Sequence, residues 1–178
     1  MKIKVSLGKI SQAIKQIEDY KNSLADKQHE FLQRLAEIGI EEATTRFSTA
    51  QYDGTNDVQV ESPVWIDDNK VAVRASGNAV TFIEFGSGYF YNENGGDHPA
   101  ADKYGFTIGG YGQGRGKGDF WYYRGEPGTN GQTPSNPKLA AKGLVFTHGN
   151  PQNRCMWEAD KKIRSEIINI AREVFGND

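Results

Sequence analysis

Hydrophobic residues recur at helical spacing along the first quarter of the chain. They form two sets: Ile10, Ile14, Ile17 and Leu24, then Phe31, Leu32, Leu35, Ile38, Ala43 and Phe47. This period predicts about 35 helical residues, with a break near Ala25 and Asp26 and a weak point at Gly39. We expect the apolar face to pack in the core, with binding of a partner as the alternative. Residues 2–7 alternate polar and apolar and predict a short strand.

The pattern then changes to period two, which predicts strands between residues 58 and 85. Apolar positions lie at 58–60, 64–66 and 71–75. Residues 67–69 form a turn signal between the second and third of these runs, and residues 77–78 form another after the third. Residues 79–85 are apolar on both faces except for Thr81 and Glu84, which predicts a central strand covered on both sides. We expect a meander of three or four antiparallel strands.

Periodicity is lost from Gly86 to Pro137, apart from a strand at 120–124. A further strand is predicted at 144–147. The last helix is opened by Asn150 and Pro151, or slightly later by Asn153, and Gly176 follows its end. Its expected buried stripe is Met156, Ala159, Ile163, Ile167, Ile170 and Val174.

These elements predict a single α+β domain over residues 1–178. An antiparallel sheet of about four to six strands is expected to pack against a long N-terminal helix, or two, and a C-terminal helix. Residues 89–137 form a long glycine- and aromatic-rich insertion loop in this scheme, with a short strand near 120–124.

Composition removes several classes of protein. The 21 basic and 23 acidic residues give a formal charge of −2, so the chain lacks a general basic field for nucleic acid. The single cysteine, Cys155, cannot form a disulfide within the chain. No apolar run has the length of a transmembrane helix, and the first residues lack the apolar stretch of a signal peptide. We therefore expect synthesis inside the cell and no membrane partner.

The glycine-rich segment is the first candidate binding site. Of the 21 glycines, 14 lie between Gly86 and Gly131. A P-loop would need glycine at 111 and serine or threonine at 118, where the chain has Tyr111 and Gly118. Aromatic and basic residues between the glycines leave a nucleic-acid-associated module open as an alternative, although residues 86–131 carry a net charge of −1. No cofactor is expected.

Two further groups of residues could in principle carry chemistry. An oxygen-rich cluster in the insertion lacks the ordered spacing of a calcium loop: Glu93, Asp97, His98 and Asp102. We expect a solvated loop there. His148 and Cys155 could form a nucleophile pair, and a position at the start of the last helix would lower the pKa of Cys155. A small packed side chain is the more common role of a lone cysteine, so we expect neither a metal site nor catalysis.

Glu84 is the most informative single residue. It lies in an apolar run just before Gly86 and Gly88. An unpaired carboxylate buried there would cost several kcal/mol or become protonated. Glu84 is therefore expected to face solvent or to pair with an arginine or with backbone amides, in a structural or subunit-contact role.

Three blocks of sequence resemble one known family. Residues 79–88 end in Ile83-Glu-Phe-Gly-Ser-Gly88, which is similar to a hydrophobic strand followed by (V/I)EFGTG. Residues 121–123 resemble an aromatic W-x-Y strand, and 147–159 resemble the entry to the last helix. The family is the gene-product-ten-like tail-component and neck proteins (head–tail connector, tail completion) of long-tailed bacteriophages. The chain departs from it after the first helix, where residues 47–54 lack the proline and leucine of a P-x-D-T-G-x-L loop.

The resemblance implies a structural protein of a phage or prophage virion, not an enzyme. Such proteins assemble as rings at the head–tail junction, which requires head-to-tail contacts that close by rotation. The implied partners are other copies of the chain and the neighbouring connector or stopper and tail-terminator or tail-tube proteins. DNA contact would be at most indirect, through the ring lumen. The implied location is the virion, and the host cytoplasm during assembly.

Under this resemblance ten residues become candidates for subunit contact or for positioning the loop. Phe82, Glu84 and Phe85 would place the segment that leads into the insertion, and Gly86 and Gly88 would let the chain turn with positive φ. The remaining candidates lie in the insertion: Tyr111, Arg115, Lys117, Trp121 and Tyr123.

Overall fold

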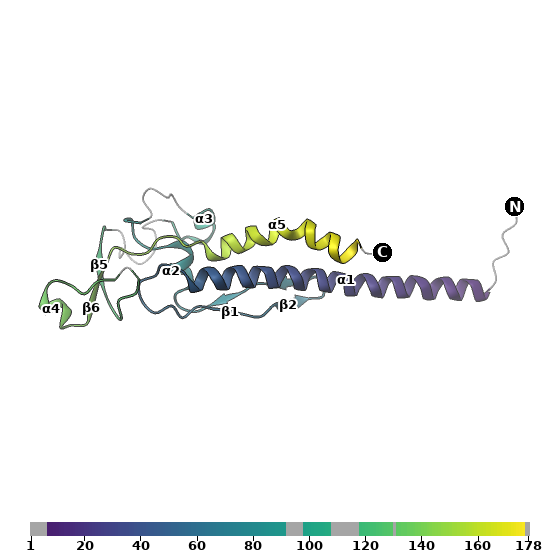
Figure 1. The fold of residues 1–178 in the computed structure, drawn as a ribbon, viewed down its shortest axis with the longest axis horizontal. Helices are drawn as coiled ribbons and strands as arrows, with labels where there is room; N and C mark the ends of the chain where they lie inside the picture. The colour runs from purple at the N-terminus through teal and green to yellow at the C-terminus, as the bar shows by residue number, and fades with distance from the viewer. Residues whose placement is uncertain (1–6, 92–97, 108–117, 130, 177–178) are drawn as a thin grey trace.

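The computed structural model describes residues 7–91, 98–107, 118–129 and 131–176 of the chain. It confirms an α+β fold with a long N-terminal helix and a C-terminal helix (Figure 1). The two helices run side by side in opposite directions, and the strands and short helices lie along them and beyond one end. None of the described helices is both long and apolar enough to cross a bilayer.

Helix α1 (Leu7–Ser48) is one continuous element of 42 residues. The expected break at Ala25 and Asp26 is wrong, because helical periodicity continues through these residues. The expected weak point, Gly39, is helical as well. Its surroundings are tightly packed, because a Cβ there would lie 2.5 Å from Ile163 Cδ1 and 3.1 Å from Val73 Cγ2. The expected strand at 2–7 lies outside the described residues except for Leu7, which begins the helix.

Helix α5 (Cys155–Phe175) packs antiparallel on the C-terminal half of α1. One core cluster joins Leu35 to Ile170 and Val174. The ion pair between Arg34 and Glu173 lies beside it. Gly176 follows the helix as expected. The expected stripe is wrong at one position, since Ile167 is 38% exposed.

A second core cluster lies where the end of α1, the start of α5 and helix α2 (Val80–Phe85) meet. Its buried members are Ala43, Phe47, Ala79, Ile83, Cys155 and Ala159. Residues 79–85 were expected to be a central strand, and this prediction is wrong. Helical geometry brings Ala79 and Ile83 to the same buried side and leaves Phe82 40% exposed. A short apolar run does not distinguish these two structures by its period.

Asp57 fixes the start of α2. Its carboxylate accepts hydrogen bonds from the backbone N–H groups of Asn78 and Ala79, both at 2.9 Å. These bonds hold the pKa of Asp57 below its usual value. Gly77 has φ of 135°, and a Cβ there would lie 2.7 Å from the Asp57 carbonyl oxygen, so the turn requires glycine.

The strands form three two-stranded antiparallel sheets within the described residues. Strand β1 (Gln59–Val60) pairs with β4 (Ala75–Ser76), and β2 (Val64–Asp67) pairs with β3 (Lys70–Ala72) across the expected turn. Strands β5 (Trp121–Arg124) and β6 (Leu144–Thr147) lie where expected and pair with each other. The described part of the chain therefore forms no single sheet of four to six strands.

Two short helices were not expected. Helix α3 (Ala101–Tyr104) lies inside the region assigned to the insertion loop, and α4 (Pro137–Ala140) precedes β6. Helix α4 has a local start signal, because the Asn136 side chain accepts a hydrogen bond from the Lys138 N–H at 3.0 Å. Its four residues are too few for a hydrophobic period to reveal them.

Candidate functional site

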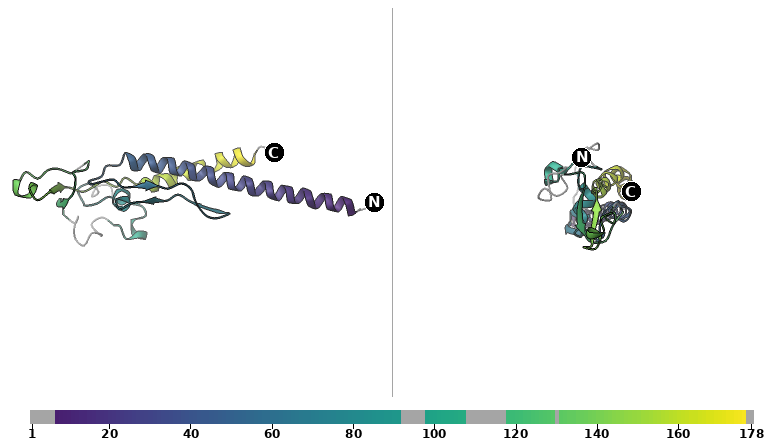
Figure 2. Two further views of the ribbon diagram at one scale, coloured as in Figure 1. Left: turned by 90° about the horizontal axis from the view of Figure 1, so that it is seen from below. Right: turned by 90° about the vertical axis from the view of Figure 1, so that its left-hand side faces the viewer.

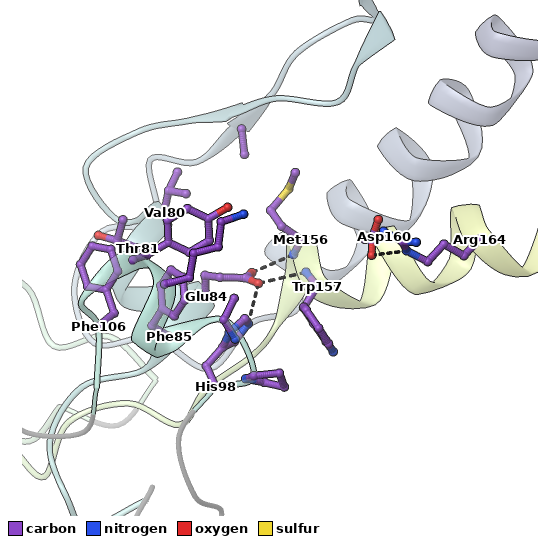
Figure 3. Close-up of a pocket in the computed structure, with 15 residues that line it drawn as sticks. Val80, Thr81, Glu84, Phe85, His98, Phe106, Met156, Trp157, Asp160 and Arg164 are labelled. Atoms are coloured by element: carbon purple, nitrogen blue, oxygen red, sulfur yellow. Dashed lines mark hydrogen bonds and ion pairs between the residues drawn. The ribbon is translucent and has the colours of Figure 1, made fainter. Parts of the chain in front are cut away.

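The candidate site is the junction around Glu84, at the point where α2 meets the first turn of α5 (Figure 3). Glu84 is buried, with 5% of its surface exposed. Its carboxylate accepts hydrogen bonds from the backbone N–H groups of Met156 at 2.7 Å and Trp157 at 2.9 Å. The first N–H groups of a helix have no partner within the helix, so Glu84 caps α5 from another element.

The residue before α5 does not supply a cap of its own. Arg154 has φ of 52°, a left-handed conformation that a non-glycine residue adopts uncommonly. Its guanidinium group donates to the Gln152 side chain at 3.0 Å. The backbone N–H groups of Asn153 and Arg154 donate to the carbonyl groups of Ile83 and Glu84 at 3.0 and 3.2 Å. The end of α2 thus holds the start of α5 through main chain and side chain together.

His98 is the third donor to Glu84. The two side chains lie 3.0 Å apart at His98 Nε2 and Glu84 Oε1, and both are buried. His98 Nδ1 accepts a hydrogen bond from the Ala100 N–H at 3.0 Å. This pattern assigns the ring proton to Nε2, which donates to Glu84. Phe85 and Trp157 pack against the imidazole edge-on, at ring-centroid distances of 4.5 and 5.7 Å.

A cavity of about 820 Å³ lies beside this pair. Its wall is mainly apolar and aromatic, with Phe85 and Phe106 on one side and the ion pair of Asp160 and Arg164 at its edge (Figure 3). Tyr104 also lines it, with its ring 6.2 Å from that of Phe85. A general base needs a free lone pair aimed at a substrate. Glu84 and His98 use their polar atoms on each other and on the backbone, so the pair holds segments together and is poorly suited to proton transfer.

Cys155 has the packed environment that its lone occurrence predicted. It is fully buried in the core cluster beneath α2. Burial, and then the charge of Glu84, raises the pKa of the thiol to about 12. The expectation of a lowered pKa at this helix start is therefore wrong, because desolvation of the thiolate outweighs the helix end.

The sequence blocks around Gly88, Trp121 and Gly149 meet next to this junction. Ser87 and Asn150 form an antiparallel bridge, with N–H to O distances of 2.9 and 3.0 Å. A Cβ at Gly88 would lie 2.7 Å from the Trp121 ring, and one at Gly149 would lie 2.1 Å from the Ser87 carbonyl oxygen. Close packing thus requires glycine at both positions. Gly86 and Gly88 have the expected positive φ, 74° and 77°.

The loop after α1 joins the same place through Asp53. Its backbone N–H donates to Asn150 Oδ1 at 2.6 Å, and its carboxylate accepts a hydrogen bond from the Thr147 hydroxyl. Asn153 adds two bonds to Gln51, one in each direction, at 2.9 and 3.0 Å. Together these bonds connect residues 51–53 with residues 147–153, two segments that lie far apart in the sequence, and Asp53, Thr147 and Asn150 are buried.

Aromatic side chains gather on one surface of the β5–β6 pair, which we call the aromatic face. Its rings form a continuous series of contacts, with centroid distances from 4.3 to 5.7 Å: Phe90, His148, Phe146, Phe120 and Tyr122. Phe90 and Phe120 are more than half exposed, at 54% and 53%, and Tyr122 is 40% exposed.

The residues proposed from sequence for subunit contact or loop positioning lie in different parts of the molecule. Glu84 and Phe85 line the cavity, and Phe82 is exposed on α2. Trp121 and Tyr123 are half-buried, while Tyr122 between them lies on the aromatic face. Tyr111, Arg115 and Lys117 lie outside the described residues.

Sequence reasoning missed the partner of Glu84. His98 was assigned to a solvated cluster and is buried instead. Glu93 and Asp97 of that cluster lie outside the described residues, and the described part of the chain holds no group of three possible metal ligands. A buried histidine inside a glycine-rich segment has no periodic signal, so only its chemical complementarity to Glu84 could have pointed to the pair.

Comparison of the chain with models of protein families, with curated proteins and with solved structures finds no match.

Proposed function

We propose that the chain is a structural protein of a phage or prophage virion that acts at the head–tail junction by assembling into a ring. The observation that carries the proposal is the convergence of the resembling sequence blocks. Residues 83–88, 121–123 and 147–159 lie far apart in sequence and meet through the Ser87–Asn150 bridge, the Trp121 contacts and the Glu84 cap. Asp53, from the loop that departs from the family pattern, joins the same network.

The chemistry of the junction supports a role without catalysis. Glu84 accepts three hydrogen bonds, two from backbone and one from His98. Cys155 carries the single thiol of the chain, and this thiol is buried and its pKa is raised. The polar groups at the centre of this site are therefore used for holding the fold.

Two surfaces are suited to contact within an assembly. The aromatic face exposes large rings at one end of the molecule, and such rings are enriched in protein interfaces. Each of the three sheets in the described residues has two strands, and an isolated two-stranded sheet has marginal stability in water. We propose that their open edges pair with neighbouring subunits or with the connector, stopper, tail-terminator or tail-tube partners, and so reach the four to six strands expected from sequence.

The test is assembly of the purified chain, followed by light scattering and negative-stain microscopy. We expect closed rings, alone or after mixing with its neighbouring virion proteins. The double variant Phe120→Ser/Tyr122→Ser should lose rings while keeping its helical circular dichroism. A matched control is Tyr20→Ser, which removes an exposed aromatic from α1. Absence of rings under both conditions would contradict the proposal.

The aromatic face also favours the second candidate, a nucleic-acid-associated module. Exposed rings can stack on bases, and Arg124 lies on the exposed side of β5. A fluorescent single-stranded oligonucleotide distinguishes the two functions. Binding that weakens steeply with salt and is lost in Phe120→Ser/Tyr122→Ser would favour this module, whereas ring assembly without DNA favours the virion protein.

A further inference from the structure

The N-terminal half of α1 extends past the rest of the fold (Figure 2). It carries a stripe of exposed apolar side chains. Every residue from Gly8 to Asp26 is exposed. The stripe consists of large apolar side chains with exposed fractions from 43% to 67%: Ile10, Ile14, Ile17 and Leu24. Monomeric proteins seldom expose such a continuous series, so this surface is suited to a partner.

The spacing of the stripe specifies the kind of partner. Ile10, Ile14, Ile17, Lys21 and Leu24 follow one another at intervals of four, three, four and three residues. This is the alternation of the a and d positions of a coiled coil, with Lys21 as the one polar member. Such a seam is filled by another helix that lies along it at a small angle.

The same series continues into the packed half of α1 at Phe31, Leu35 and Ile38. There it is covered by α5, which shows how a helix fills this seam. Helix α5 ends at Phe175, whose ring lies 5.7 Å from that of Phe31. The N-terminal half of the seam therefore begins where its intramolecular cover stops.

We propose that this half of α1, Gly8–Asp26, pairs with the same segment of a second copy of the chain in an antiparallel coiled coil. Two copies of the segment have the same length and align fully in opposite directions. Each copy therefore covers the part of the seam that α5 leaves open on the other. Lys21 can reach past the seam with its long side chain and keep its charge in water.

Charge favours the antiparallel direction. Residues 8–17 contain two lysines and no acidic residue, whereas residues 18–26 contain three acidic residues and one lysine. Antiparallel pairing brings the basic part of one helix toward the acidic part of the other. Parallel pairing would place the basic parts of the two helices side by side, and likewise the two acidic parts.

The rest of the fold also favours this direction. In a parallel pair both bodies would lie at the same end, and α5 already covers the seam of each α1 from Phe31 onward. The two helices would have to separate at that point. The body lies toward the C-terminal end of α1 (Figure 1). In an antiparallel pair the two bodies would therefore lie at opposite ends.

This inference does not depend on the proposed function. An antiparallel pair uses the same surface on both copies and closes at two, whereas ring contacts join different surfaces. The helix pair and the ring contacts therefore use different parts of the molecule, and each can fail without the other.

The first experiment measures mass by light scattering over a range of protein concentrations. We expect a concentration-dependent shift from 19.7 kDa to twice that mass. The variant Ile14→Gln/Ile17→Gln should stay monomeric, because it removes the centre of the seam. The matched control Gln12→Ala/Gln16→Ala changes the opposite side of the same turns and should pair normally. Helical circular dichroism of the body checks that each variant folds.

The second experiment determines direction with spin labels on Gly8→Cys. A Cβ at Gly8 meets no atom within 4 Å, and Cys155 is buried, so the label attaches at the new site. In antiparallel pairing the two labels are offset along the helix axes by about 27 Å, from 18 residues at a rise of about 1.5 Å each. In parallel pairing they lie at the same level, and only the distance of about 10 Å between the helix axes and the lengths of the two outward-facing labels separate them. Antiparallel pairing therefore predicts the longer label distance.

Several outcomes would overturn the inference. They are a monomer at all concentrations, a trimer, a short label distance, or equal behaviour of Ile14→Gln/Ile17→Gln and wild type. Binding of the segment to anionic lipid vesicles in place of pairing would also overturn it. If the chain forms rings but the wild type shows no pairing through α1, the inference fails while the proposed function stands; pairing through α1 without any ring gives the reverse.

Discussion

At the scale of single residues, the molecule depends on a carboxylate that is shared between elements. Glu84 accepts hydrogen bonds from two amides of α5 and from His98 on a third segment. Because a free carboxylate is costly to bury, its neighbours in sequence indicated that Glu84 either faces solvent or pairs with an arginine or with backbone amides. The structure shows the backbone amides, together with His98. The identity of these partners was not predictable, because α5 and His98 reach Glu84 only through the tertiary fold.

Replacing Glu84 tests this role. The variant Glu84→Gln keeps the shape of the side chain but weakens its three charge-assisted hydrogen bonds, so the free energy of unfolding should fall by about 1–3 kcal/mol. Urea unfolding followed by circular dichroism measures the change. The control Glu158→Gln lies in the first turn of α5, where the carboxylate forms an ion pair with the exposed Lys161, so it should change stability by less than about 1 kcal/mol. Equal effects of the two variants would contradict the cap.

Cys155 provides a second residue-level test. Its pKa of about 12 keeps the thiol protonated in the folded protein. At pH 8 a thiol reagent should therefore react with Cys155 only after denaturation, whereas the exposed Gly8→Cys site should react at once. Above pH 9 the unfolded chain ionises at this thiol and the folded chain does not, so unfolding should become easier as pH rises from 9 toward 12. Rapid labelling of the native wild type would show that the thiol is accessible.

At the scale of elements, prediction from sequence succeeded where the pattern was long. The two long helices, β5 and β6 were found because their periods or flanking signals are clear. Residues 79–85 were misassigned because a run of seven residues that is apolar except for Thr81 and Glu84 suits a helix and a strand equally well. The Asp57 bonds that start α2 come from 21 and 22 residues away, and no local pattern contains them.

Gly39 shows the same limit within a correctly predicted helix. By propensity alone, Gly39→Ala should stabilise α1 by about 1 kcal/mol. The new methyl group would instead contact Ile163 and Val73, so we expect a net loss of about 1–2 kcal/mol in the free energy of unfolding. The control Gly8→Ala has open space around it and should be neutral or slightly stabilising. Thermal unfolding of both variants measures the difference, and stabilisation by Gly39→Ala would mean that α5 can move away.

At the scale of the whole molecule, stability should vary along α1. Residues 31–47 pack against α5 and the β strands, whereas residues 8–26 are exposed. Most of the stability of a helix in a protein comes from packing of its apolar face, and in a single chain residues 8–26 are exposed. In dilute protein, amide hydrogen exchange should therefore be much faster in residues 8–26 than in 31–47. Equal protection of the amide hydrogens in residues 8–26 and 31–47 at every protein concentration would contradict this expected difference in stability. Protection that increases with concentration in 8–26 alone would match pairing of the helices.

The shared carboxylate of Glu84 has a consequence for any molecule that enters the neighbouring cavity. His98 and the Trp157 N–H both donate to Glu84 Oε1, while the Met156 N–H donates to Oε2 of the same carboxylate. A ligand that draws His98 away would change how firmly α5 begins, without touching that helix. By thermodynamic linkage the effect is mutual, so a contact that stabilises the start of α5 must alter the ligand's affinity by the same factor. One side chain thereby couples the cavity to the helix that packs along α1.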